Sequence, residues 1–172
     1  MDFLTLAKER YSLRKFSDKA IEKEKLDKVL EAAKVAPTAV NYQPQRILVL
    51  DGEKNREKMQ KCTKYAFNAP IYILVCYDKE KSWKRSYDGA DFGEVDAAIV
   101  GTHIMLQAAE LGLGTCFVGA FDPSKAKEEF DLPENYVAAA IFPIGYPAED
   151  AHPAHLHEKR LDLSETVFYE KF

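Results

Sequence analysis

The sequence is poor in the features that mark several common protein classes. Its three cysteines, Cys62, Cys76 and Cys116, are too far apart to form a CxxC motif or a disulfide framework. No apolar run approaches the ~18 residues that a membrane-spanning helix needs. The N-terminus, MDFLTLAKER, carries charges too early to resemble a secretory signal. We therefore expect a cytoplasmic protein that has no membrane partner.

Basic residues are not in excess either. The chain has 24 Lys and Arg against 28 Asp and Glu, which gives a formal net charge of -4. We expect no nucleic-acid partner, and any anion site must be a local cluster of basic groups. The glycines also lack the dinucleotide-binding pattern, because GLGTCF from Gly112 has no third glycine and enters a strand rather than a helix.

What remains is an ordinary globular chain. It has 172 residues, 47% apolar and 30% charged, and we expect residues 1–172 to form a single domain. Helices are expected at 21–36, 53–64, 94–111 and after Asp122-Pro123, and strands at 46–50, 71–77, 115–120 and 136–144. In the longest helix we expect the inner face to comprise Val95, Ala98, Ile99, Thr102, Met105, Leu106 and Ala109. The alternation by itself favours a parallel α/β sheet.

The first candidate site is Arg10-Tyr11-Ser12-Leu13-Arg14. If this segment is extended, Arg10, Ser12 and Arg14 share one side, with neighbours about 6–7 Å apart. Guanidinium forks and a hydroxyl suit the oxygens of a phosphate. The alternative is a solvated basic loop that pairs with some of the acidic residues.

Two further segments have polar or glycine-rich character. The loop Pro37–Pro44 offers amide donors and acceptors at Asn41 and Gln43, although it also fits an ordinary turn between a helix and a strand. The glycines of Gly112–Gly119 allow a backbone to approach a flat ligand, although a helix C-cap followed by a core strand explains most of them.

Three histidines, His152, His155 and His157, lie close together around Pro153. Imidazoles in one short loop could bind zinc or nickel, with a solvated linker as the alternative. We favour the linker and predict no metal site.

Taken together, these segments resemble the nitroreductase family of flavoproteins. The resemblance is carried by ERYSLRKF, APTAVNYQP, APIYILV, DAAIVGTHIMLQAAELGLGTCFVG from Asp96 to Gly119, and the closing KRLDLSETVFYEKF. Each piece is weak alone, but together they cover essentially the whole chain in the family's order.

The resemblance implies an α+β fold, with a central, mostly antiparallel sheet flanked by helices, in place of a parallel sheet. It implies an obligate homodimer that holds FMN at the subunit interface. We expect a C-terminal arm, residues 158–172, that packs across the partner subunit, in keeping with this dimer. The alternative is that the arm packs on its own domain.

Roles for individual residues follow from the same resemblance. Arg10 and Ser12 would hold the FMN phosphate, while Arg14 would reach the pyrimidine edge of the flavin and raise its reduction potential. The remaining cofactor-binding positions are Tyr11 in the same motif, Arg160 with its neighbour Lys159 on the phosphate, Thr38, Ala39 and Asn41 from the partner subunit, and Val118 and Gly119 at the ring. The Gly119 N–H would lie near N5, the atom that accepts hydride.

The implied activity is that of an FMN-dependent NAD(P)H oxidoreductase that reduces nitroaromatic, quinone or enone-like small molecules by a ping-pong mechanism. No side chain need act as a catalytic residue, because the flavin carries the chemistry. Residues 61–65 do not match the Asn and Lys with which many members bind the ring. The alternatives are the same flavin fold with another reaction, dehalogenation or flavin breakdown, and a flavin- or metal-binding module without turnover.

Overall fold

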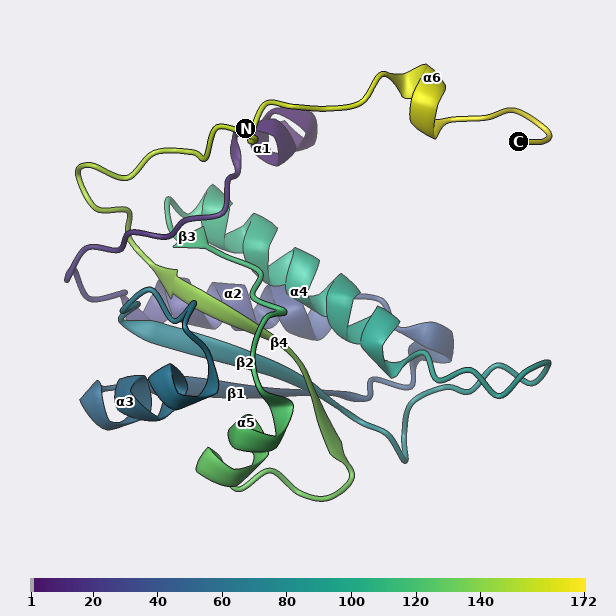
Figure 1. Cartoon of the computed structure of the whole chain (residues 1–172), viewed down its shortest axis with the longest axis horizontal. Helices are drawn as coiled ribbons and strands as arrows, with labels where there is room; N and C mark the ends of the chain where they lie inside the picture. Colours follow the sequence, from purple (N-terminus) through teal and green to yellow (C-terminus); the bar gives the residue numbers. More distant parts are fainter. Residues whose placement is uncertain (1) are drawn as a thin grey trace.

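The protein is described by a computed structural model over residues 2–172, in which one four-stranded sheet carries helices on both faces (Figure 1). The strands are β1 (Gln45–Asp51), β2 (Ile71–Asp78), β3 (Gly114–Thr115) and β4 (Tyr136–Gly145). Their order is β1-β2-β4-β3, and all three pairings are antiparallel. The α+β prediction is therefore confirmed. The parallel sheet favoured by alternation is wrong, because a helical connection can return the chain to either end of a neighbouring strand.

The helices form two layers around the sheet. On one face lie α2 (Lys23–Val35) and α4 (Gly93–Glu110), and on the other lie α3 (Glu53–Cys62) and α5 (Pro123–Glu129). The remaining helical elements are α1 (Phe3–Glu9), the 3-10 turn η1 (Ala39–Asn41) and the single turn α6 (Leu163–Thr166). Strand β2 is buried along its whole length, and its side chains alternate between the two layers. This double burial explains its continuous apolar run.

The three cysteines lie in the core as free thiols. Burial raises the pKa of the Cys62 thiol to about 11 and that of the Cys76 thiol to about 12. A thiol reacts as its thiolate, so both groups are unreactive near neutral pH. The three cysteines therefore serve as small core residues.

The buried face of α4 is not the one expected from the sequence. The residues that it turns to the sheet and α2 are Gly93, Asp96, Ala97, Val100, Gly101, Ile104 and Ala108. Val95, assigned to the inner face, is 48% exposed instead. The helix carries apolar residues on nearly every side, so its periodicity does not distinguish the face that packs on the sheet from the opposite one.

The strand expected over 115–120 is only partly formed. Gly114 and Thr115 pair with β4, but the next two residues form no regular strand pairing. Val118 then forms an isolated bridge to Ile141 in the same register. Cys116 stands opposite Pro143 in that register, and a proline has no N–H to donate to the ladder. Pro143 therefore interrupts the pairing and leaves Cys116 and Phe117 outside regular strand structure.

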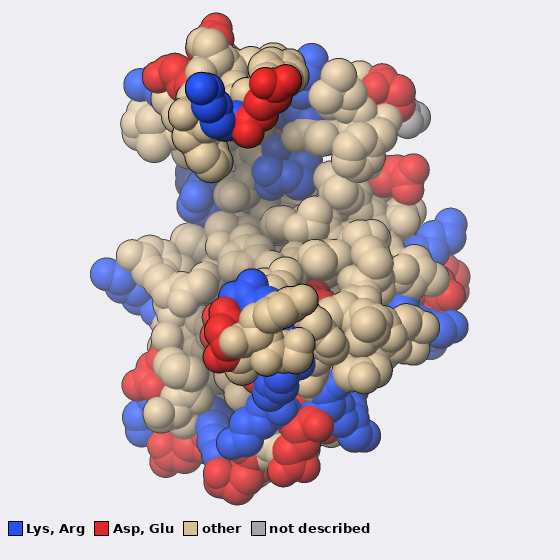
Figure 2. Space-filling model, turned by 90° about the vertical axis from the view of Figure 1, so that its right-hand side faces the viewer, with Lys and Arg blue, Asp and Glu red and all other residues tan. Residues whose placement is uncertain are grey.

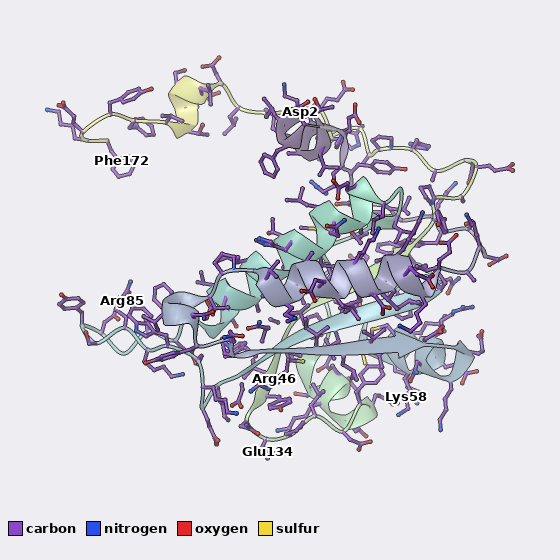
Figure 3. All side chains as sticks on the ribbon, turned by 180° about the vertical axis from the view of Figure 1, so that it is seen from behind. Asp2, Arg46, Lys58, Arg85, Glu134 and Phe172 are labelled. Carbon is purple, nitrogen blue, oxygen red and sulfur yellow. The ribbon has the colours of Figure 1, made fainter. Side chains whose placement is uncertain are left out.

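Two segments project from the body. Residues 79–92 form a narrow hairpin that carries Arg85, and residues 158–172 form an arm that ends at Phe172 (Figures 1 and 3). Every residue of the arm is exposed, including Leu163 and Phe172. Among the described residues, no helix is long and apolar enough to cross a membrane.

A close approach of α4 to β4 yields a test of this packing. A Cβ placed on Gly101 would lie 2.3 Å from Cζ of Phe142, whose ring is fully buried. We expect Gly101→Ala to lower the free energy of unfolding by about 1–3 kcal/mol through overpacking. Gly119→Ala is the matched control, because a Cβ there meets no atom within 4 Å. Equal stability of the two variants in chemical denaturation would contradict this packing.

Candidate functional site

The N-terminal motif lies beside the edge of the sheet. Helix α1 ends at Glu9, and the chain continues through Arg10 in extended conformation. Ser12 forms a parallel bridge with Thr115, and the Leu13 N–H donates to the Thr115 carbonyl over 2.9 Å. Leu13 is buried, whereas Arg14 beyond it is exposed. The segment is therefore extended, which is the condition under which Arg10, Ser12 and Arg14 share one side, and its polar side chains lie on the outer side.

This motif meets the start of the C-terminal arm. One hollow of about 230 Å³ is lined by Arg10, Tyr11, Ser12, Arg14, Ala154, Leu156, His157 and Arg160. We call it the basic hollow. A second hollow of about 180 Å³, which includes Lys15 and His152, shares Ser12, Arg14 and Ala154 with it. Figure 2 shows Lys and Arg atoms at the bottom of the recess below the overhanging arm.

The arginines of the basic hollow lack acidic partners. Within residues 2–172, no carboxylate forms an ion pair with Arg10, Arg14 or Arg160. Arg14 Nη1 instead donates to the Ser12 carbonyl over 3.1 Å, and Arg160 Nη1 donates to the Lys159 carbonyl over 2.8 Å. Three guanidinium groups beside one hydroxyl form a donor set that suits a phosphate.

The glycine-rich segment Gly112–Gly119 adjoins the basic hollow. Burial raises the pKa of the Cys116 thiol, while the charge of Arg14, a hydrogen bond with Ser12 and the charge of Arg10 act in the opposite direction. Cys116 therefore lies within electrostatic reach of both arginines. The chain then leads directly to Val118 and Gly119, so the structure brings the first and third candidate segments together.

Gly119 lies on an open surface. It is exposed, and a Cβ there would meet nothing within 4 Å, whereas Val118 is buried and bonded to Ile141. A broad hollow of about 640 Å³ lies beside it, lined by residues 60–65 and 120–122. A hydrogen bond joins these two segments, because the Thr63 hydroxyl donates to the Ala120 carbonyl over 2.7 Å. Backbone N–H groups and a flat approach are thus available at Gly119.

The second candidate segment lies elsewhere in the same chain. Ala39 and Asn41 belong to the turn η1, which Thr38 precedes, and the Ala39 N–H donates to Asp96 near the start of α4. The basic hollow lies near the other end of this helix, whose 18 residues span about 27 Å (Figure 1). One chain therefore does not bring this loop to Arg10 and Arg14, in keeping with its implied role toward a partner subunit.

Two placements were not foreseen. Lys159 is exposed and does not line the basic hollow, although its carbonyl accepts from Arg160. His157 does line it, and its ring meets that of Tyr11 edge-on at 6.1 Å between centroids. In the sequence, the one feature that connects His157 with the basic hollow is its position three residues before Arg160.

In the described part of the chain, no group of three or more His, Cys, Asp or Glu is arranged to hold a metal.

The sheet between two helical layers, with a cationic hollow at its edge, defines an α+β protein with a candidate phosphate site. Comparison with known proteins is more specific. The family described as "Putative TM nitroreductase" matches residues 3–171. The chain belongs to the nitroreductase family.

Individual relatives agree with this assignment. A "Putative NADH dehydrogenase/NAD(P)H nitroreductase" from Methanothermobacter thermautotrophicus is 34% identical, over 87% of this chain and 80% of that protein. A solved nitroreductase family protein from Clostridium difficile 630 is 44% identical over the whole of both chains, with a TM-score of 0.94. An FMN-dependent nitroreductase from Clostridium difficile R20291 is 30% identical, covering 99% of this chain and 100% of that one, with a TM-score of 0.80.

The unpaired guanidinium groups predict phosphate binding. Inorganic phosphate should raise the melting temperature, and Arg10→Gln or Arg14→Gln should weaken its binding at least tenfold, because one charge-assisted hydrogen bond contributes about 1.5–3 kcal/mol. Arg56→Gln is the control, since Arg56 pairs with Glu53 far from the hollow. A phosphate response that is the same in all four proteins would contradict this assignment.

Proposed function

We propose that this chain is an FMN-dependent NAD(P)H oxidoreductase that reduces nitroaromatic, quinone or enone-like acceptors. The observation that carries the proposal is the basic hollow at the sheet edge, where a serine hydroxyl lies with three guanidinium groups that form no ion pair within residues 2–172. Membership of the nitroreductase family and the FMN-dependent relative support the same cofactor. A cytoplasmic location stays a prediction from the sparse cysteines.

The residues present fit the phosphate end of FMN. Arg10, Ser12 and Arg160 would hold the phosphate, because their side chains line one hollow and the arginines have no competing carboxylate. Arg14 lies in both adjoining hollows, so its charge can act on the phosphate or on the pyrimidine edge of the ring. Tyr11 and His157 close the side of the basic hollow with an edge-on ring contact.

The ring would lie against the glycine-rich segment. FMN, when bound, supplies the capacity to accept a hydride and pass electrons onward. The chain contributes position and electrostatics. The open surface at Gly119 admits a flat ligand, and a positive charge from Arg14 near the ring would favour negative charge that develops there. No side chain needs to act as a nucleophile.

A second copy of the chain would complete the site. Thr38, Ala39 and Asn41 lie at the far end of α4 from the basic hollow, so they can reach a flavin only across an interface. The exposed arm supports such an assembly, because Leu163 is 75% exposed and Phe168 is 50% exposed in the isolated chain. We infer a homodimer with two equivalent sites, in which residues 158–172 pack across the partner.

The cofactor assignment predicts that the protein distinguishes FMN from riboflavin by the phosphate group. The purified protein should bind FMN and turn yellow, and it should bind riboflavin at least tenfold more weakly, since riboflavin lacks the group that the arginines hold. NADH or NADPH should bleach the flavin colour under anaerobic conditions. Colourless protein that FMN cannot reconstitute would refute the proposal, and bound flavin that neither nucleotide reduces would leave only a binding module.

The use of one site for both reactants predicts ping-pong kinetics. NAD(P)H must leave before the acceptor enters, so double-reciprocal plots at several acceptor concentrations should be parallel. Intersecting lines would indicate a ternary complex and refute this order of events. Failure of nitroaromatics, quinones and enones to reoxidise the reduced protein would instead favour another reaction on the same fold.

If the arm packs across the partner subunit, the proposed dimer should depend on the apolar residues of the arm. Removal of residues 161–172 keeps Arg160 but deletes the exposed leucines and aromatics, so we expect the dimer to dissociate at concentrations where the full chain stays associated. Light scattering measures this. Tyr87→Ala is a suitable control, because Tyr87 is 95% exposed at the tip of the hairpin, away from the arm. A full-length monomer that retains flavin would overturn the interface site.

A further inference from the structure

A buried carboxylate marks the start of α4. Asp96 is 1% exposed, and its Oδ1 accepts a hydrogen bond of 2.8 Å from the Ala39 N–H. Among the described residues its other oxygen, Oδ2, has no hydrogen-bond partner and no contact with solvent. A carboxylate in such a place is costly for folding, and an apolar residue on this helix face would pack more cheaply. The first turn of α4 favours a negative charge and offsets part of this cost, and the bond to Ala39 ties the carboxylate to the loop of residues 38–43.

The loop that Asp96 holds is under backbone strain. Val40, Asn41 and Gln43 have φ values of 46°, 56° and 51°, in the left-handed region that favours glycine. For Val40 this is most unfavourable, because its side chain branches at Cβ. Strained backbone persists only where its surroundings fix it, and it is concentrated at functional sites.

The internal bonds of the loop do not fix its position on the molecule. The Gln43 N–H donates to the Thr38 hydroxyl over 3.0 Å, and the Asn41 N–H donates to the Thr38 carbonyl over 3.0 Å. These bonds shape the loop from within. Within residues 2–172, the bond from Ala39 to Asp96 is the one hydrogen bond that joins residues 38–43 to α4. At the other end of the loop, Arg46 Nη1 donates to the Gln43 carbonyl over 3.2 Å, so loss of the Asp96 bond would free the part of the loop around Ala39 rather than its β1 end.

We propose that Asp96 is a positioning residue, which fixes the strained loop of residues 38–43 so that Thr38, Ala39 and Asn41 meet the flavin bound by the partner subunit. This role rests on the proposed function. Asp96 itself does not touch the cofactor and acts only through the Ala39 amide. An acceptor oxygen at this position is what the role requires, so asparagine can replace it, whereas alanine cannot.

Hydrogen exchange and FMN affinity together test the role. In full-length Asp96→Ala, the Ala39 amide should exchange at least tenfold faster, while amides of β2 keep their protection, because only the loop has lost its acceptor. The dissociation constant of FMN should rise about tenfold. Asp96→Asn should restore both quantities to near the wild-type values, since its side-chain oxygen can still accept from Ala39.

A second variant separates positioning from general destabilisation. Met59→Ala removes a fully buried side chain of the opposite core layer and weakens the whole fold without touching the loop. The proposal is overturned if Met59→Ala weakens FMN binding as much as Asp96→Ala does. It is also overturned if Asp96→Ala leaves the Ala39 exchange rate or the FMN affinity unchanged.

Failure of the proposed function would look different. Wild-type protein that binds no FMN would refute the cofactor assignment. The exchange rate of the Ala39 amide in the three variants would still decide whether Asp96 anchors the loop.

Discussion

The candidate site depends on the pairing of Ser12 and Leu13 with Thr115. This short parallel contact fixes the N-terminal segment beside β3, so that Arg10 and Arg14 stand over the stretch that leads to Gly119. The buried Leu13 side chain holds the segment in register, and alternation then turns its polar neighbours outward. Residues more than a hundred positions apart in the sequence thereby form one surface.

Charge balance gives this surface its chemical character. The chain as a whole is acidic, and many of its surface cations, such as Lys15 with Asp150, stand beside a carboxylate. The arginines of the basic hollow differ, because no carboxylate among residues 2–172 forms an ion pair with them and their charges repel one another. A bound anion would remove that repulsion, so the folded chain is prepared for a negatively charged ligand rather than stabilised by these residues.

Much of this architecture could be predicted from the sequence. The apolar run of β2 and the Asp122-Pro123 start of α5 are local signals, and both predictions are confirmed. The segment near Ser12 is extended, which meets the condition set for Arg10, Ser12 and Arg14 to share one side. The antiparallel sheet was predicted from the resemblance to the nitroreductase family, because local sequence patterns do not encode strand direction. The roles of the individual cofactor-binding residues stay predictions.

The errors arose where a partner element decides the outcome. The inner face of α4 depends on which side meets α2 and the sheet, and a helix that is apolar nearly all round carries no such information. The strand over 115–120 lapses because of Pro143, which lies opposite Cys116 only once the register is known. The role proposed for Asp96 has no local signal in the sequence, because it depends on the half-buried Ala39 amide that the carboxylate meets only in the folded chain.

The arm has one further consequence for the life of the protein. Arg160 lies just two residues before Asp162, the cap of α6, so the segment that carries the exposed apolar groups also carries one charge of the basic hollow. If the arm packs across a partner as proposed, cleavage within it or dissociation of the subunits would also remove Arg160 from the basic hollow. Subunit dissociation and release of the cofactor into solution would then occur together.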